Sequence, residues 1–318
     1  MKKNTVIIMI LMFGIIFAFG LMAQGSKKAL EEEVKGAIKP TITATDNRQE
    51  IKMVERKVKK QPEIEKSRKV KIEKSNVPFG EWSKVEFFDE NGKVKKILQE
   101  SKYDFKTREE RIITSSADNK YIAVVDNKTK KNTDEMLYKT GWAYDRKTEI
   151  TIYNDNGDII THKDELNCVI VMLSADGKRF LCFIGSPDTG ADDTIVTETI
   201  DPCKMASVSV YTINGELLYR KTSGDIANIC GFDSPKFSPS GNWIVVRTQD
   251  DKVCVLGVDT KEEYVLEDVD INDETRMHNY IGINDKGELE FWKFKDREVV
   301  GKYYYSPKER NLYDVIEE

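Results

Sequence analysis

The chain has 318 residues, of which 39% are hydrophobic and 33% charged, and its formal net charge is −5. It can therefore bury a sizeable core, as one large domain or two ordinary ones. The charge is uneven, because residues 26–80 carry 15 Lys and Arg against 9 Asp and Glu. The remaining body is acidic and would repel nucleic acid, so we expect no nucleic-acid partner.

Residues 1–25 have the pattern of an export signal. Lys2 and Lys3 precede an uncharged apolar run over residues 6–23, and Ala23 and Gly25 stand where a signal peptidase requires small residues. The run is also near the lower length limit for spanning a bilayer, so the segment is either a cleaved signal peptide or a membrane anchor. We expect an exported protein, periplasmic or otherwise extracytoplasmic.

Residues 26–80 are rich in Lys and Glu and poor in aromatic residues. Such a composition cannot offset the entropy cost of ordering a core. We expect a charged stalk or linker, with an edge strand added to a later sheet array as the alternative. Its positive charge beside an acidic body would suit an anionic membrane surface, although a solvated linker explains the same surplus of Lys.

A turn motif recurs four times beyond this segment. Its clearest copy is Ser174-Ala175-Asp176-Gly177, which lies between two apolar runs. The fourth position of each copy is Asn or Gly, the residue types that accept the positive φ of a tight hairpin turn. The runs that follow are rich in β-branched and aromatic residues, which predicts inner strands. The fourth-position residues are Asn119, Gly177, Gly241 and, in the weakest copy, Gly287.

A second motif, Asn-Gly between alternating runs, interleaves with the first at residues 91–92, 156–157 and 214–215. Asn-Gly in this setting is a strong hairpin signal. Two alternating hairpins give four antiparallel strands per repeat. With a period of roughly 40 to 65 residues, this is the pattern of β-propeller blades.

At these residues the chain resembles the exported bacterial WD40-like propellers of the TolB type, whose blades carry a Ser-x-Asp-Gly-Lys turn ahead of an apolar strand. The resemblance implies an all-β, propeller-like array of four or five four-stranded blades over residues 81–318. The chain departs from the motif at Ser240, where Asp is expected, and at a shifted fourth turn, which leaves the blade number open. Another repetitive all-β array is the alternative. The expected blades span residues 82–98, 111–162, 168–221, 232–266 and 280–316.

Five cysteines lie between residues 168 and 254. Cys168, Cys182 and Cys254 fall in predicted strands, where we expect buried free thiols that act as small apolar residues. Cys203 and Cys230 fall in predicted loops and are the favoured disulfide pair of an exported chain. No CxxC spacing supports thiol redox chemistry or a zinc knuckle.

The sequence contains little material for catalysis. It has two histidines, His162 and His278, and no G-x-S-x-G elbow. Asp188-Thr189-Gly190 resembles the active-site loop of retroviral-type aspartic proteases, but Pro187 interrupts the preceding strand and no second copy occurs. An exported hydrolase using Asp188 is therefore the alternative function. We expect no cofactor, with Ca²⁺ at an acidic loop of Asp188, Asp192 and Asp193 as a milder use of these residues.

Motif spacing predicts long insertions between the second and third strands of two consecutive blades, at residues 126–148 and 185–206. Because strand direction alternates, both must emerge on one face. That face would present Trp142 and Tyr144 among lysines beside Asp188, Asp192 and Asp193. We therefore predict a non-catalytic binding or scaffolding module of the cell envelope, with an envelope protein or peptide as its partner.

Overall fold

The computed structural model describes residues 42–43, 51–58, 64–77, 80–104, 106–131, 144–185, 204–268, 270–272, 275–295 and 297–317. The chain divides into two compact units, Met1–Ile42 and Thr43–Glu318, and the architecture below is that of the second. The expected export segment, residues 1–25, lies outside the described residues. Within the described ranges, no helix has the length and apolarity needed to cross a membrane.

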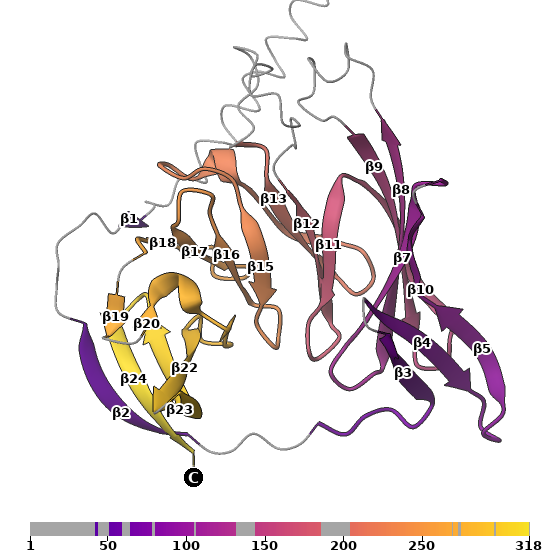
Figure 1. Cartoon of the computed structure of the whole chain (residues 1–318), viewed down its shortest axis with the longest axis horizontal. Coiled ribbons are helices and arrows are strands. Elements are labelled where there is room, and N and C mark those ends of the chain that lie inside the picture. Colours follow the sequence, from indigo (N-terminus) through magenta and orange to yellow (C-terminus); the bar gives the residue numbers. More distant parts are fainter. Residues whose placement is uncertain are drawn as a thin grey trace, which may run out of the picture. The chain divides into compact units, whose positions relative to one another are not determined.

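Apart from two N-terminal strands and one short ribbon, the described strands form antiparallel sheets in chain order, which we number as blades 1 to 5 (Figure 1). Blade 1 has three strands, β3 (Val70–Val77), β4 (Gly80–Phe88) and β5 (Val94–Gln99). Blade 2 has five, β6 (Ser101–Asp104), β7 (Glu109–Ser115), β8 (Tyr121–Lys131), β9 (Tyr144–Asn154) and β10 (Ile159–Leu166). Blade 3 has four, β11 (Cys168–Leu173), β12 (Arg179–Ile184), β13 (Ser207–Thr212) and β14 (Leu217–Thr222).

Blade 4 contains β15 (Asp233–Phe237), β16 (Trp243–Arg247), β17 (Val253–Gly257) and β18 (Glu263–Leu266). Blade 5 contains β21 (Gly282–Ile283), β22 (Leu289–Lys295), β23 (Glu298–Ser306) and β24 (Asn311–Glu317), together with β2 (Lys52–Val58) from near the N-terminus. The smaller elements are β1 (Ile42–Thr43), the ribbon β19 (Asp270–Asn272) with β20 (Thr275–Arg276), and the 3-10 helices η3 (Ser223–Asp225) and η4 (Met277–Asn279). The expected all-β array of four or five propeller-type blades is confirmed.

The inner strands of blades 2 to 4 are buried on both faces, as their continuous apolarity predicts. Four consecutive residues are buried in each of β8, β12 and β16, and all five are buried in β17. The outer strand β10 instead alternates between exposed and more buried positions. This gradient from inner to outer strand is what a blade with a solvated outer edge requires.

Apolar clusters join each blade to the next. Val85 and Phe87 of blade 1 pack with Ile122 of blade 2, and comparable clusters link blades 2 and 3, 3 and 4, and 4 and 5. Among the described residues, no such cluster joins blade 5 to blade 1. The described core is thus a succession of layers between blades, in which the sheets of blades 2, 3 and 4 each share both faces with a neighbour.

Three described strands, β1, β2 and β3, lie inside the range 26–80, where the sequence predicts a stalk. β3 pairs with β4 in blade 1, and β2 pairs in parallel with the last strand, from Lys52 opposite Asn311 to Val58 opposite Glu317. Residues 52–58 therefore form the edge strand that was the alternative prediction. A charged strand suits this position because charges at a sheet edge discourage pairing with other chains.

Candidate binding face

The recurring turn is built by side-chain hydrogen bonds that explain its residue types. The Ser174 hydroxyl accepts a bond from the Arg179 amide at 3.1 Å and donates to Asp176 at 2.8 Å, while Asp176 accepts from the Lys178 amide at 3.1 Å. Ser116 and Asp118 repeat this arrangement in blade 2. All four fourth-position residues have positive φ, as predicted: Asn119 (57°), Gly177 (68°), Gly241 (71°) and Gly287 (78°).

Hydrogen bonds join the recurring turn of each blade to that of the next, from blade 2 to blade 5. The Ala117 amide donates to the Ala175 carbonyl at 3.1 Å, and the Asp176 amide donates to the Pro239 carbonyl at 3.3 Å. In the third copy Ser240 replaces Asp, and its amide donates to Asp285 of the fourth copy at 2.8 Å. These turns define one face of the array, which we call the turn face.

The opposite face, which we call the loop face, carries the connections β8–β9, β12–β13 and β16–β17 together with the links between blades. The Asn167 amide, in the link between blades 2 and 3, donates to the Arg146 carbonyl near the start of β9 at 2.7 Å. The Ser223 amide donates to the Ala206 carbonyl at 2.7 Å in the same way. Links and connections therefore lie side by side, as the alternation of strand direction predicts.

The connections themselves differ in length from blade to blade. β8 and β9 are each 11 residues long, so the first connection spans residues 132–143 rather than the predicted 126–148. The second spans residues 185–206, as predicted. The first is shorter because the flanking strands continue pairing up to Lys131 and Tyr144.

The predicted site residues can be placed only in part. Tyr144, expected in a loop, is the first residue of β9, because its backbone extends the ladder with β8. Trp142 and the three acidic residues lie outside the described residues, so their grouping into one site stays a prediction. The hydrolase alternative gains no support from the described residues for the same reason. The acidic residues are Asp188, Asp192 and Asp193.

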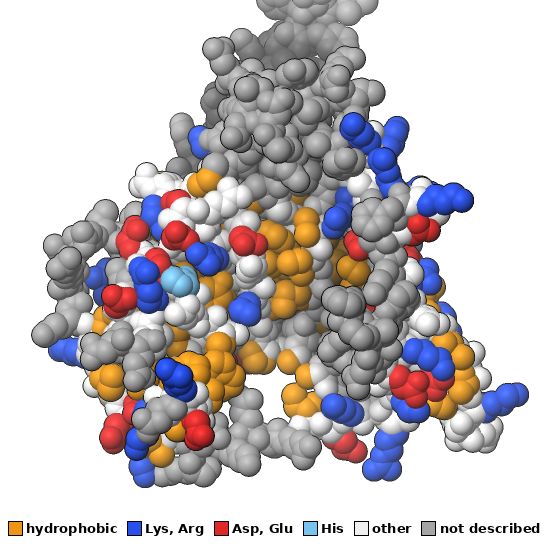
Figure 2. Space-filling view, in the orientation of Figure 1, with side chains coloured by type: hydrophobic (Ala, Val, Ile, Leu, Met, Phe, Trp, Pro, Cys, Tyr) orange, Lys and Arg blue, Asp and Glu red, His pale blue; other side chains and the backbone are white. Residues whose placement is uncertain are grey.

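A charged cluster that sequence reasoning missed lies in the link between blades 4 and 5. His278 Nδ1 lies 2.6 Å from Asp268 Oδ2, and the His278 amide donates to the other carboxylate oxygen at 3.0 Å. The Arg276 guanidinium lies 3.2 Å from Asp268 and 3.3 Å from Asp270. Figure 2 shows acidic and basic side chains intermingled over β19 and β20. No period or motif marks these residues, since they come from an irregular link.

The described side chains of this cluster satisfy one another by hydrogen bonds and ion pairs. Asp268 has a side chain only 12% exposed, and its two oxygens are shared among an imidazole, a guanidinium and an amide. Nearby, the hydrogen bond from Arg247 to Asp251 raises the pKa of the guanidinium, and burial raises the pKa of Tyr280. Charged side chains held together by ion pairs are suited to recognition of a polar partner surface.

Three cysteines are confirmed as buried free thiols: Cys168, Cys182 and Cys254. A hydrogen bond with Cys168 and burial raise the pKa of Cys182, and burial raises the pKa of Cys254 to about 12. Such thiols are inert packing groups. Cys230 is disulfide-bonded, while Cys203 lies outside the described residues, so the pair Cys203–Cys230 stays a prediction.

No family model and no curated protein matches the sequence. Solved structures are similar in part. An oligogalacturonate lyase in complex with manganese is 10% identical, with a TM-score of 0.38, over 64% of this chain and 52% of that one. Pyrococcus horikoshii acylaminoacyl peptidase is 12% identical, with a TM-score of 0.38, over 74% of this chain and 36% of that one. The propeller domain of the Pyrococcus furiosus Trilobed protease is 10% identical, with a TM-score of 0.29. The match covers 61% of this chain and 52% of that one. The chain spans about half or less of each of these structures.

Proposed function

We propose that this protein is an exported, non-catalytic binding or scaffolding module of the cell envelope, and that its loop face contacts a protein or peptide partner. The observation that carries the proposal is the difference in connection length between blades. Connections 132–143 and 185–206 occur in the consecutive blades 2 and 3, whereas blade 4 joins its second and third strands through residues 248–252 alone. Long loops on a rigid sheet scaffold are where binding usually resides.

The composition of these connections supports recognition of a polypeptide. Trp142 supplies an aromatic anchor among lysines, and Asp188, Asp192 and Asp193 supply opposite charge. Aromatic side chains that dominate binding energy are commonly surrounded by charged groups that set specificity and association rate. The Asp268–His278 cluster adds fixed polar groups on the same face.

Deleting residues 188–193, or combining Trp142→Ala with Tyr144→Ala, should weaken capture of envelope partners by at least about tenfold, as expected when interface anchors are removed. The melting temperature of each variant is measured alongside, so that loss of partner binding is distinguished from loss of fold. Capture from envelope extracts, followed by titration of the recovered partner, measures the effect.

The matched control is Lys120→Ala with Lys178→Ala, which removes two exposed charges from the turn face. It should leave capture unchanged. If both loop-face variants fold and retain every partner that the wild type captures, the partner does not bind this face.

Export is tested independently of the partner. Expressed as the full chain, the protein should be recovered from the extracytoplasmic fraction, with residues 1–25 either removed or retained as an anchor. The basis is the pair Lys2-Lys3 followed by the apolar run at residues 6–23. Recovery in the cytoplasm with an intact N-terminus would refute the export proposal and leave the binding proposal standing.

A further inference from the structure

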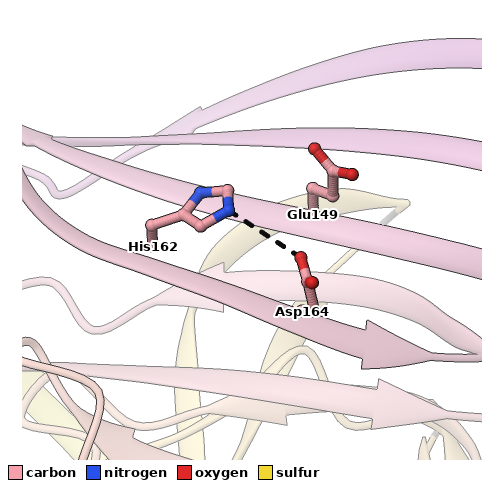
Figure 3. A group of neighbouring side chains, drawn as sticks. All are labelled: Glu149, His162 and Asp164. Carbon is pink, nitrogen blue, oxygen red and sulfur yellow. Dashed lines mark ion pairs between the residues drawn. The ribbon is translucent and has the colours of Figure 1, made fainter.

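One imidazole and two carboxylates meet on the outer hairpin of blade 2. Glu149 comes from β9, and His162 and Asp164 come from β10 (Figure 3). Asp164 is directly opposite Glu149 in the ladder, and His162 is opposite Thr151. One potential ligand atom from each of the three residues lies within 4.8 Å of the others. Because all three stand on paired strands, the backbone fixes their spacing.

The imidazole of His162 is oriented for coordination. Its Nδ1 lies 3.1 Å from the Thr151 hydroxyl, while its Nε2 is turned toward Asp164 Oδ1 at 3.8 Å. A hydrogen bond at one ring nitrogen is the usual means of orienting a histidine that binds metal through the other. Thr151 would thus act as the outer partner of the ring, leaving Nε2 to face the two carboxylates.

The two carboxylates already share one cation, the ammonium group of Lys147. Like charges directly opposite each other in a ladder are destabilising. Here the Lys147 ammonium lies 2.6 Å from Glu149 and 3.9 Å from Asp164 and offsets their repulsion. The Lys147 side chain is 53% exposed, so it can swing into solvent at little cost and leave its place to another cation.

We propose that Glu149, His162 and Asp164 bind a divalent transition-metal ion, for which zinc is the probe. One imidazole nitrogen and two carboxylate oxygens are ligands that zinc accepts, and further positions remain for water or for a side chain of a partner. Ligand atoms around tetrahedral zinc lie roughly 3.4 Å apart, so the exposed carboxylates must close by about an ångström, which their rotamers permit. The three ligand residues lie on β9 and β10, and none of them belongs to the connections or links that define the loop face.

The presence of only two histidines gives the proposal an internal control. Full-length protein without a polyhistidine tag is titrated with zinc by calorimetry and by NMR of the imidazole protons. The His162 signals should shift and those of His278 should not. His162→Ala should weaken binding at least tenfold and Asp164→Asn should weaken it, whereas His278→Ala should leave it unchanged. Lys147→Met should tighten binding, because the competing cation is removed.

A thermal readout separates binding from folding. Zinc should raise the melting temperature of wild type and of His278→Ala but not of His162→Ala, since a ligand stabilises only the state that binds it. The His162 side chain is 56% exposed, so its removal should not disturb the fold in the absence of metal. Equal zinc affinity in wild type and His162→Ala, or equal shifts of both imidazoles, would mean an adventitious ion only and would overturn the proposal.

Discussion

Gly177→Val is expected to lower the free energy of unfolding by about 3 kcal/mol or more, the largest effect of any single turn substitution here. Gly177 has a φ of +68°, where a β-branched residue is strained. A Cβ at this position would also lie 2.7 Å from Cε2 of Tyr121, on the neighbouring blade. The substitution therefore adds steric overlap between blades 2 and 3 to the backbone strain.

Two variants separate these contributions. Gly92 has a comparable φ of +74° but nothing within 4 Å of a Cβ, so Gly92→Ala should show the backbone cost alone, about 1 kcal/mol. Gly177→Ala should cost clearly more. Asn119→Gly, at a φ of 57°, should be nearly neutral because glycine tolerates the same conformation. Chemical denaturation followed by tryptophan fluorescence measures all four, and equal stability of Gly177→Val and wild type would refute the turn assignment.

The turns were predictable from sequence because their requirements are local. A positive φ admits few residue types, and the Ser174 and Asp176 side chains bond to amides within five residues. The inner strands were predictable for a similar reason, since burial on both faces imposes continuous apolarity. The boundaries of blades 3 and 4 followed from these two signals, whereas blades 1 and 2 begin earlier than predicted, at β3 and β6.

Long-range pairing leaves no comparable local signal. The sequence of β2, KMVERKV, is mostly charged and exposed, so its partner cannot be read from its own pattern. The same applies to the Asp268–His278 pair in an irregular link and to Glu149 opposite Asp164. Both contacts depend on the path and register of the backbone between the two residues, which no local pattern specifies. Tyr144 was predicted in a loop but lies in β9, because β9 begins before its apolar part. Polar residues can continue a ladder at a solvated end, as they do here up to the pair Lys131–Tyr144.

A partly buried ion pair reinforces the backbone ladder that joins β2 to β24. Arg56 Nη1 donates to both carboxylate oxygens of Glu288, at 2.6 and 2.8 Å, and the guanidinium carbon lies 3.3 Å from the centroid of the Tyr313 ring. The Glu288 side chain is only 6% exposed and also accepts a bond from Asn284 at 2.8 Å. Arg56 thus links β2 to Glu288, which directly follows the recurring turn of blade 5, and lies over the Tyr313 ring.

Arg56→Ala should destabilise the fold by about 3 kcal/mol, because it leaves the buried charge of Glu288 without its cationic partner. Arg56→Met with Glu288→Gln should recover part of this loss, since no buried charge then remains. Lys52→Ala, at an exposed position of the same strand, is the matched control and should be nearly neutral. Denaturation measures stability, and limited proteolysis should cleave upstream of blade 1 faster in Arg56→Ala than in Lys52→Ala. If the two single variants unfold and are cleaved alike, β2 is not held by this pair, and the backbone ladder with β24 must suffice.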